Sequence, residues 1–114
     1  MAETFNTADI AVTNSEQLLY TAPAATGDVA IIISLRVTNI DGAADDTVTC
    51  TIYESDGTTK KAEIAHTMTV PADSSLELAG TSKIVLLEGE QVKITGAAAS
   101  GDLEAYLSAL EITA

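Results

Sequence analysis

Large apolar side chains at every second position of one segment constrain the fold of this chain most. Between residues 29 and 39 the even positions 34, 36 and 38 are polar, and the odd positions carry Val29, Ile31, Ile33, Leu35 and Val37. A period of two is typical of a β-strand with one buried face. We therefore predict a strand over residues 29–39 whose odd-numbered side chains point into the core.

The same alternation recurs along the chain, with turn-forming residues between the alternating segments. Further strands are expected at residues 17–22, 47–54, 60–70, 76–78, 83–87, 92–98 and 103–113, with weaker alternation at 9–13. No segment has the periodicity of a helix. Turns about 8–12 residues apart are typical of a sandwich or barrel. The sequence thus predicts an all-β fold of eight or nine short antiparallel strands.

The length of the chain limits its domain organisation. At 114 residues it can form one domain and is too short for two ordinary ones. We expect residues 16–114 to form the β-sandwich domain, and residues 1–15 to form an N-terminal arm or a first edge strand. Such an arm could reach a neighbouring molecule by adding a strand to an open sheet edge.

The clearest hairpin signal lies in the middle of the chain. Ser-Asp-Gly-Thr at residues 55–58 favours a tight turn with positive φ angles at Asp-Gly. On the strand before it, Val48, Cys50 and Ile52 are expected to face inward, and the threonine row to be exposed. On the strand after it, the inward residues are expected to be Ala62, Ile64, His66, Met68 and Val70.

The last strand changes phase along its length. Leu103, Ala105 and Leu107 share one parity, whereas Leu110 and Ile112 have the other. A β-bulge near residue 108 would restore the inward direction. The alternative is that this strand is buried on both faces.

The charge balance argues against two classes of partner. The formal net charge is −12, from 17 acidic and 5 basic residues. Nucleic-acid binding needs clustered Lys and Arg, and anionic membranes repel an acidic surface, so neither partner is expected. The longest apolar run, residues 29–33, is far shorter than the roughly 20 residues of a membrane helix. Residues 1–5 lack a signal-peptide pattern, so we expect a soluble product that stays inside the producing cell.

Two residues are single representatives of chemically versatile types. His66, placed on the apolar face, is interpreted as a neutral structural residue, with metal or catalytic work as the minority alternative. Cys50 is expected to be a buried free thiol. A contact between the two, on hairpin partners, stays open, and a nucleophilic Cys50 is the remote alternative. We predict no catalytic, cofactor or metal site, and zinc is excluded because further His or Cys ligands are lacking.

Acidic residues cluster at three places, namely Asp41/Asp45/Asp46, Glu88/Glu90 and Asp102/Glu104. Oxygen-rich loops can hold calcium, but none of these clusters has the ligand spacing of an EF-hand. Turn chemistry alone favours Asp, so solvated turn carboxylates are the expected interpretation, with calcium as the alternative.

A resemblance adds to this pattern. The order of several segments is similar to that of small virion proteins of tailed bacteriophages; the segments are residues 19–25, 30–42, 60–62, 70–78, 83–92 and 107–113. This resemblance implies a jelly-roll-like β-sandwich, without enzymatic activity, that assembles as a homotrimer or on a symmetric lattice. It carries no functional-residue motif.

The resemblance also implies a function. The leading hypothesis is a capsid decoration (cement) protein made in the host cytoplasm, which binds the major capsid protein or other virion proteins on the capsid exterior. A neck, tail or fibre component is the second hypothesis. A receptor-like or carbohydrate-binding module is the third, disfavoured because only 4% of the residues are aromatic, and an enzyme is the last.

Overall fold

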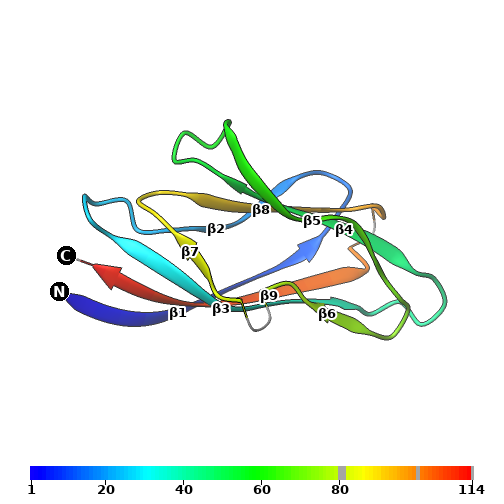
Figure 1. The fold of residues 1–114 in the computed structure, drawn as a ribbon. Coiled ribbons are helices and arrows are strands. Elements are labelled where there is room, and N and C mark those ends of the chain that lie inside the picture. The colour runs from blue at the N-terminus through cyan, green and yellow to red at the C-terminus, as the bar shows by residue number, and fades with distance from the viewer. Residues whose placement is uncertain (80–81, 100, 114) are drawn as a thin grey trace.

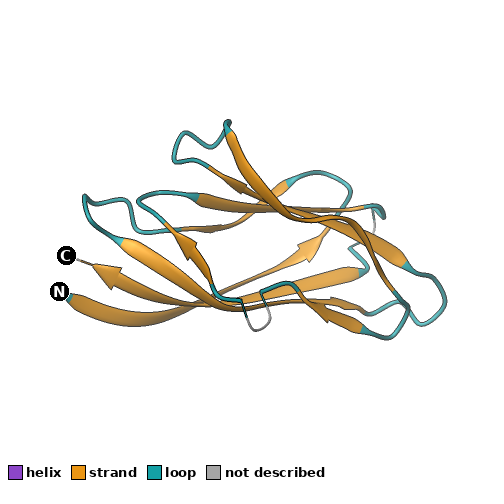
Figure 2. Ribbon diagram, viewed as in Figure 1, coloured by secondary structure: helices purple, strands orange, loops and turns teal. Residues whose placement is uncertain are grey.

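The structure, a computed structural model, describes residues 1–79, 82–99 and 101–113. Within these residues the regular elements are all strands (Figure 2). They are β1 (Ala2–Val12), β2 (Gln17–Thr21), β3 (Val29–Asn39), β4 (Asp46–Tyr53), β5 (Lys60–Val70), β6 (Ser75–Glu77), β7 (Ile84–Leu86), β8 (Gln91–Gly96) and β9 (Leu103–Thr113). The predicted all-β class and the expected number of strands are confirmed.

The strands form two antiparallel sheets that lie face to face (Figure 1). Sheet A has the order β1-β9-β3-β6, with β7 also paired to β3, and sheet B has the order β2-β8-β4-β5. The chain switches repeatedly from one sheet to the other, as in a double-sheet jelly roll. The jelly-roll-like single-domain sandwich is therefore confirmed, with overall dimensions of 47 × 25 × 20 Å.

The core between the sheets is aliphatic. Its largest fully buried side chains include Ile32, Leu35, Leu86, Ile94, Leu103 and Leu107. Full burial of one such side chain contributes roughly 1.5–3 kcal/mol. Because the chain has a single cysteine, no disulfide within it supplements this layer, and the contacts between the two inner faces hold the sandwich together.

Strand β3 has the predicted bounds, but its first half faces the other way. Ala30 and Ile32 are fully buried, and the ladder with β9 shifts between Ile32 and Ser34. The extra residue, Ile33, forms a β-bulge, which lets both halves of a strand bury side chains of different parity. Beyond the bulge, Leu35 and Val37 are fully buried as predicted.

The predicted inward orientation is thus wrong for the first three odd residues of β3, which are only partly buried: Val29, Ile31 and Ile33. The simple alternation failed because it assumed one unbroken phase over eleven residues. These three side chains belong to the outer face of sheet A, opposite the core.

Strand β9 keeps its phase throughout. Ala109 is fully buried, and Glu111 accepts a hydrogen bond from Tyr20 in the opposite sheet, so the odd side chains stay inward to the end. No bulge occurs on β9 itself. The bulge of this ladder lies opposite Ser108 but on β3. Leu110 and Ile112 therefore face outward and are partly buried there, whereas Glu104 and Tyr106 on the same face are exposed. The alternative of a strand buried on both faces is thus confirmed only in part.

The central hairpin joins β4 and β5, as predicted, through a longer turn. Residues 54–59 form the connection, and only Gly57 has a positive φ, of 74°. Asp56 accepts hydrogen bonds from the Thr59 hydroxyl and from the backbone N–H groups of Thr58 and Thr59. The Thr59 hydroxyl bond is the largest cause of a lowered Asp56 pKa, of about 2. The predicted positive φ is therefore confirmed for Gly57 and wrong for Asp56.

Val48, Cys50 and Ile52 of β4 are buried as predicted. The other face of this strand is less exposed than expected, because Thr51 and Tyr53 are buried too. Thr51 lies between Glu63 of β5 and Lys93 of β8 in the sheet. The prediction of an exposed threonine row fails for this central strand, whose two neighbours both carry long side chains.

Strand β5 departs furthest from its predicted face. Its ladder with β4 shifts at three places, and Thr67 has a positive φ of 49°. These irregularities bring Ala65 inward instead of its neighbour His66. Of the five residues predicted to face inward, only Val70 is fully buried, Ile64 is partly buried, and the rest are exposed.

Strand β1 lies at one edge of sheet A. All eleven of its residues pair with β9 without a register shift, from Ala2 opposite Thr113 to Val12 opposite Leu103. Residues 2–7 are exposed, whereas Ala8, Ile10 and Val12 contact the core. The N-terminal segment therefore pairs as an edge strand, and its first half extends beyond the part of the sandwich that sheet B covers (Figure 1).

Candidate interaction surface

The structure places His66 on the surface, so the prediction of a core histidine is wrong. Its side chain is 75% exposed, and its Nδ1 lies 2.9 Å from a Glu63 carboxylate oxygen. The bulged course of β5 turns this side chain away from the sandwich. The contact with Cys50 that the sequence left open does not form, because Ala65 lies opposite Cys50 in the ladder.

Cys50 is fully buried, as expected. Burial raises the pKa of its thiol to about 12, so the thiol is protonated at neutral pH. A nucleophile must be a thiolate within reach of its substrate, and Cys50 meets neither condition. Its place in the core is that of a small apolar side chain.

The first acidic cluster is used in local hydrogen bonds. Asp41 accepts from the backbone N–H of Ala43, and Asp45 accepts from that of Ala72. Asp46 accepts from the N–H groups of Thr47 and Ala97, and its second carboxylate oxygen, Oδ2, is buried without a hydrogen-bond partner. These carboxylates stabilise the loops at one end of the sandwich.

The second cluster has a similar structural use. Glu88 accepts a hydrogen bond from the backbone N–H of Gly27, and Glu90 forms an ion pair of 2.6 Å with Lys61. Within residues 1–79, 82–99 and 101–113, no three His, Cys, Asp or Glu side chains are grouped to hold a metal ion.

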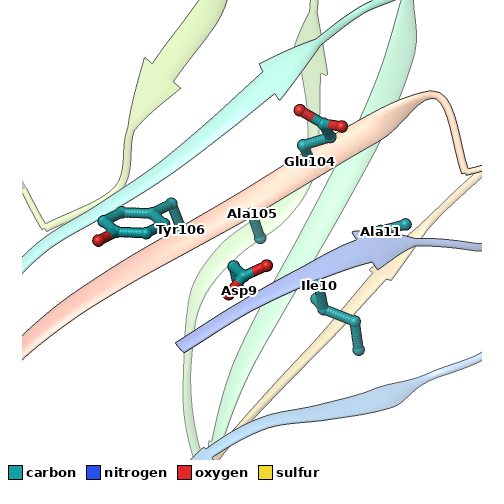
Figure 3. Close-up of a pocket in the computed structure, with 6 residues that line it drawn as sticks. All are labelled: Asp9, Ile10, Ala11, Glu104, Ala105 and Tyr106. Atoms are coloured by element: carbon teal, nitrogen blue, oxygen red, sulfur yellow. The ribbon is translucent and has the colours of Figure 1, made fainter. Parts of the chain in front are cut away.

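The third cluster contributes to a groove on the outer face of sheet A. Glu104 and Tyr106 of β9 and Asp9 of β1 line a depression of about 500 Å³, together with Ile10, Ala11 and Ala105 (Figure 3). In the ladder, Asp9 lies opposite Tyr106 and Ala11 lies opposite Glu104. Two carboxylates beside an aromatic ring suit a cationic group, but no His, Cys, Ser or Lys among the described residues lines the groove.

A row of apolar side chains crosses the same outer face. We define the apolar row as Phe5, Leu110, Ile31 and Val85, which lie opposite one another on β1, β9, β3 and β7. The two ends of the row are the most exposed, with Phe5 at 77% and Val85 at 54%. Exposed apolar patches are a common feature of surfaces that contact other molecules.

The sequence indicates that some strands have apolar side chains on both faces, but it does not show that these side chains form a row. Apolar residues of both parities occur in residues 29–33 and again in residues 107–112. They indicate strands that are apolar on both faces. That four such side chains form a continuous row depends on the order of the strands in sheet A, which the sequence pattern does not contain.

A second, smaller depression lies where the edges of the two sheets approach each other. It has a volume of about 170 Å³ and is mostly apolar; its lining is Ile52, Lys61, Ala62, Ile64, Ile84, Val85 and Glu90. The ion pair between Lys61 and Glu90 joins β5 to the turn before β8 beside it. This contact holds the bulged strand β5 against the rest of the sandwich.

A polar cluster under the uncovered end of sheet A escaped sequence analysis. The Tyr20 hydroxyl of β2 and the Asn6 amide of β1 both donate to the Glu111 carboxylate of β9. Burial and, secondarily, the hydrogen bond to Glu111 raise the pKa of Tyr20. The cluster joins sheet B to sheet A and to β1 through one inward carboxylate, on a strand that the sequence predicted to change phase.

No protein-family model and no curated protein matches the chain. Among solved structures it is similar to a chain from the disulfide-linked pili of Bacillus endospore appendages. The TM-score is 0.61 at 15% identity, over 98% of this chain and 87% of that chain. It is also similar to a chain from infectious bursal disease virus, Gx strain, with a TM-score of 0.57 and 12% identity, over 97% of this chain and 30% of that chain.

At these identities the similarity shows a shared fold alone. The jelly-roll sandwich of this chain therefore occurs both in an appendage subunit and in a virus. The buried position of Cys50, the single cysteine here, does not suit a disulfide to another chain. In the described part of the chain, no helix is long and apolar enough to cross a membrane.

Proposed function

We propose that this protein is a structural component of a virus particle, namely a capsid decoration protein of a tailed phage. It binds the outer capsid surface after synthesis in the host cytoplasm, and it has no enzymatic activity. The observation that carries the proposal is the apolar row on a sheet face of a strongly acidic protein. Such a face fits adhesion to another protein.

The net charge supports a position outside the shell. At −12 the chain would be repelled by packaged DNA. The jelly-roll fold, common in viral capsid domains, and the resemblance to small phage virion proteins support the same class. None of these observations implies chemistry at a reactive site.

The proposed mechanism is thermodynamic. A protein that binds the assembled shell but not its separated parts shifts the equilibrium toward the shell. The apolar row, flanked by Val29 and Ile112, is the face that would contact the major capsid protein. The trimer that the resemblance implies is part of this proposal, and three copies around a capsomer junction would be visible by cryo-electron microscopy.

Heating particles with and without the added protein tests the function. Particles that carry the protein should disrupt at a higher temperature. Val85→Lys places a charge on the row and should abolish this effect, whereas Met68→Lys, at a similarly exposed position on β5, should preserve it. Equal disruption temperatures with and without the wild-type protein would contradict the proposal.

A neck, tail or fibre component is the second candidate. The similarity to a pilus subunit, which extends over 87% of that chain, favours it. Copy number separates the two candidates, because decoration needs hundreds of copies per particle and a neck ring needs about a dozen. Quantitative gel analysis of purified virions measures that number.

A further inference from the structure

The edge strands of the sandwich differ in how well they are protected against pairing. Natural sheets protect edges with short strands, bulges, Lys and Pro. Strand β2 has five residues, a register shift and Pro23 shortly after it, and β6 and β7 have three residues each. Strand β5 has three register shifts and begins with Lys60 and Lys61.

Of these protective features, which also include charged side chains in general, strand β1 has only the carboxylates of Glu3 and Asp9. It is eleven residues long, contains no Lys and no Pro, and pairs with β9 without a bulge. Its residues 2–7 are exposed, so no described part of the chain covers the first half of this edge. The Thr7 N–H donates to the Asn6 Oδ1 at 2.9 Å, and the other backbone N–H and C=O groups on the open side are available to another extended strand.

We propose that β1 pairs antiparallel with β1 of a second copy of this chain, about a two-fold axis at Phe5. The two copies of sheet A then form one continuous sheet. A two-fold contact joins the same surface on both partners, so the strand must be complementary to itself. The outward side chains of β1 test this condition.

The outward residues of β1 are Glu3, Phe5, Thr7, Asp9 and Ala11, each opposite an outward residue of β9. With Phe5 opposite Phe5 of the second copy, Glu3 lies opposite Thr7 and no two carboxylates face each other. A shift that places Phe5 opposite Thr7 puts Glu3 opposite Asp9, and like charges directly opposite are destabilising. The register centred on Phe5 is therefore favoured, and it also forms an aromatic pair.

This register extends the apolar row across both copies. In one copy the row runs across the strands in the order Val85, Ile31, Leu110 and Phe5. Phe5 would then contact Phe5 of the second copy, and the row of that copy would follow in the opposite order, ending at its Val85. Each copy carries a charge of −12, so mutual repulsion opposes the contact. Salt screens such repulsion, and pairing should therefore strengthen as the ionic strength rises.

The contact is independent of the proposed function. A two-fold contact through β1 differs from the three-fold contact of a trimer and could join copies from neighbouring trimers. The Val85→Lys variant should lose shell binding but keep the β1 contact, whereas a variant of Phe5 should lose the β1 contact. Failure of one proposal is thus distinguishable from failure of the other.

Sedimentation of the full chain over a range of concentrations tests the contact. Phe5→Lys should raise the dissociation constant of the pair by roughly tenfold or more, because it removes the aromatic pair and places two like charges in opposition. Val85→Lys adds the same charge to the same face and should leave the dissociation constant unchanged. Wild-type association that weakens with salt, or is unaffected by Phe5→Lys, would overturn the proposal.

Oxidative cross-linking tests the register. In Phe5→Cys the two cysteines should lie opposite each other, at a Cα separation of about 4.5–5.5 Å that permits a disulfide. In Asp9→Cys they should be about 27 Å apart and remain uncross-linked. Wild type is the blank, since Cys50 is buried. Equal cross-linking of both variants, or none in Phe5→Cys, would contradict the register; circular dichroism checks that each variant folds.

Discussion

Strands β1 and β5 are both eleven residues long and both lie at a sheet edge, yet they are built in opposite ways. Strand β1 keeps one register with its neighbour from end to end. Strand β5 loses register three times and contains Thr67 in a left-handed conformation. One strand is regular and open, and the other is irregular and closed to further pairing.

The difference shows where the protein can bind partners through its backbone. A bulged edge twists away and offers no continuous line of N–H and C=O groups. The bulges of β5 also determine which side chains enter the core, since they place Ala65 inward and His66 outward. Regularity at β1 therefore leaves a continuous edge for the proposed contact, and irregularity at β5 fixes the packing.

The largest expected change in the free energy of unfolding comes from placing a carboxylate at the inward residue of β5, Ala65, and the comparison is the same substitution at its outward neighbour, His66. Ala65→Asp would bury a carboxylate opposite Cys50 and should lower the free energy of unfolding by about 3 kcal/mol or more. His66→Asp, one residue away and exposed, should change it by less than about 0.5 kcal/mol. Urea unfolding measures both, and the reverse order would show that His66, and not Ala65, faces the core.

A smaller loss of stability is expected when the polar cluster at Glu111 of β9, the neighbour of β1, is removed. Glu111→Ala removes the acceptor of the Tyr20 hydroxyl and of the Asn6 amide and should cost about 1.5–3 kcal/mol. Amide hydrogen exchange in residues 2–7 should become faster, because this end of sheet A loses its link to sheet B. Glu3→Ala, on the exposed outer face of the same end, is the control, and equal effects of the two would refute the role of Glu111.

Cys50, on β4 beside β5, gives a pH-dependent test of burial. Its folded pKa of about 12 exceeds its ordinary value of 9.0. The neutral thiol therefore contributes stability that is fully present below pH 9 and is lost as pH rises toward 12. From pH 9 upward, wild type should lose about 1.4 kcal/mol per pH unit relative to Cys50→Ala. Urea unfolding of both proteins at pH 8 and pH 10 should show this divergence, and parallel curves would contradict it.

The smallest effect concerns the strained residue of β5. Thr67→Gly relieves a positive φ of 49° on a β-branched residue and should raise stability by up to about 1 kcal/mol. Thr69→Gly, in the same strand but without a positive φ, should instead lower it by about 0.5–1 kcal/mol. Thermal unfolding distinguishes the two, and a loss of stability in Thr67→Gly would show that the conformation carries no strain.

The sequence predicted the strands well because their signals are local. The bounds of β3 and β9 are those predicted from alternation and turn chemistry, residues 29–39 and 103–113. The inward face of β4 was also predicted, since Val48, Cys50 and Ile52 are buried. Each of these results depends on a few consecutive residues.

The errors occur where a bulge changes the phase. Ile33 and the residues around Thr67 have no distinct local signature, because a bulge is determined by the neighbouring strand. For the same reason the apolar row was not foreseen: it combines Phe5 with Val85, eighty residues later in the chain. Sequence periodicity describes single strands, whereas an interaction surface depends on their order in the sheet.

The pairing of Ala2 with Thr113 has a mechanical consequence. A force that pulls these two residues apart would separate β1 from β9 by breaking the hydrogen bonds of the ladder one after another. A pull along the strand between Ala2 and Leu103 would instead load the whole ladder in shear. If the protein reinforces a pressurised particle, tension should therefore act along the strands of sheet A and not across the pair of Ala2 and Thr113.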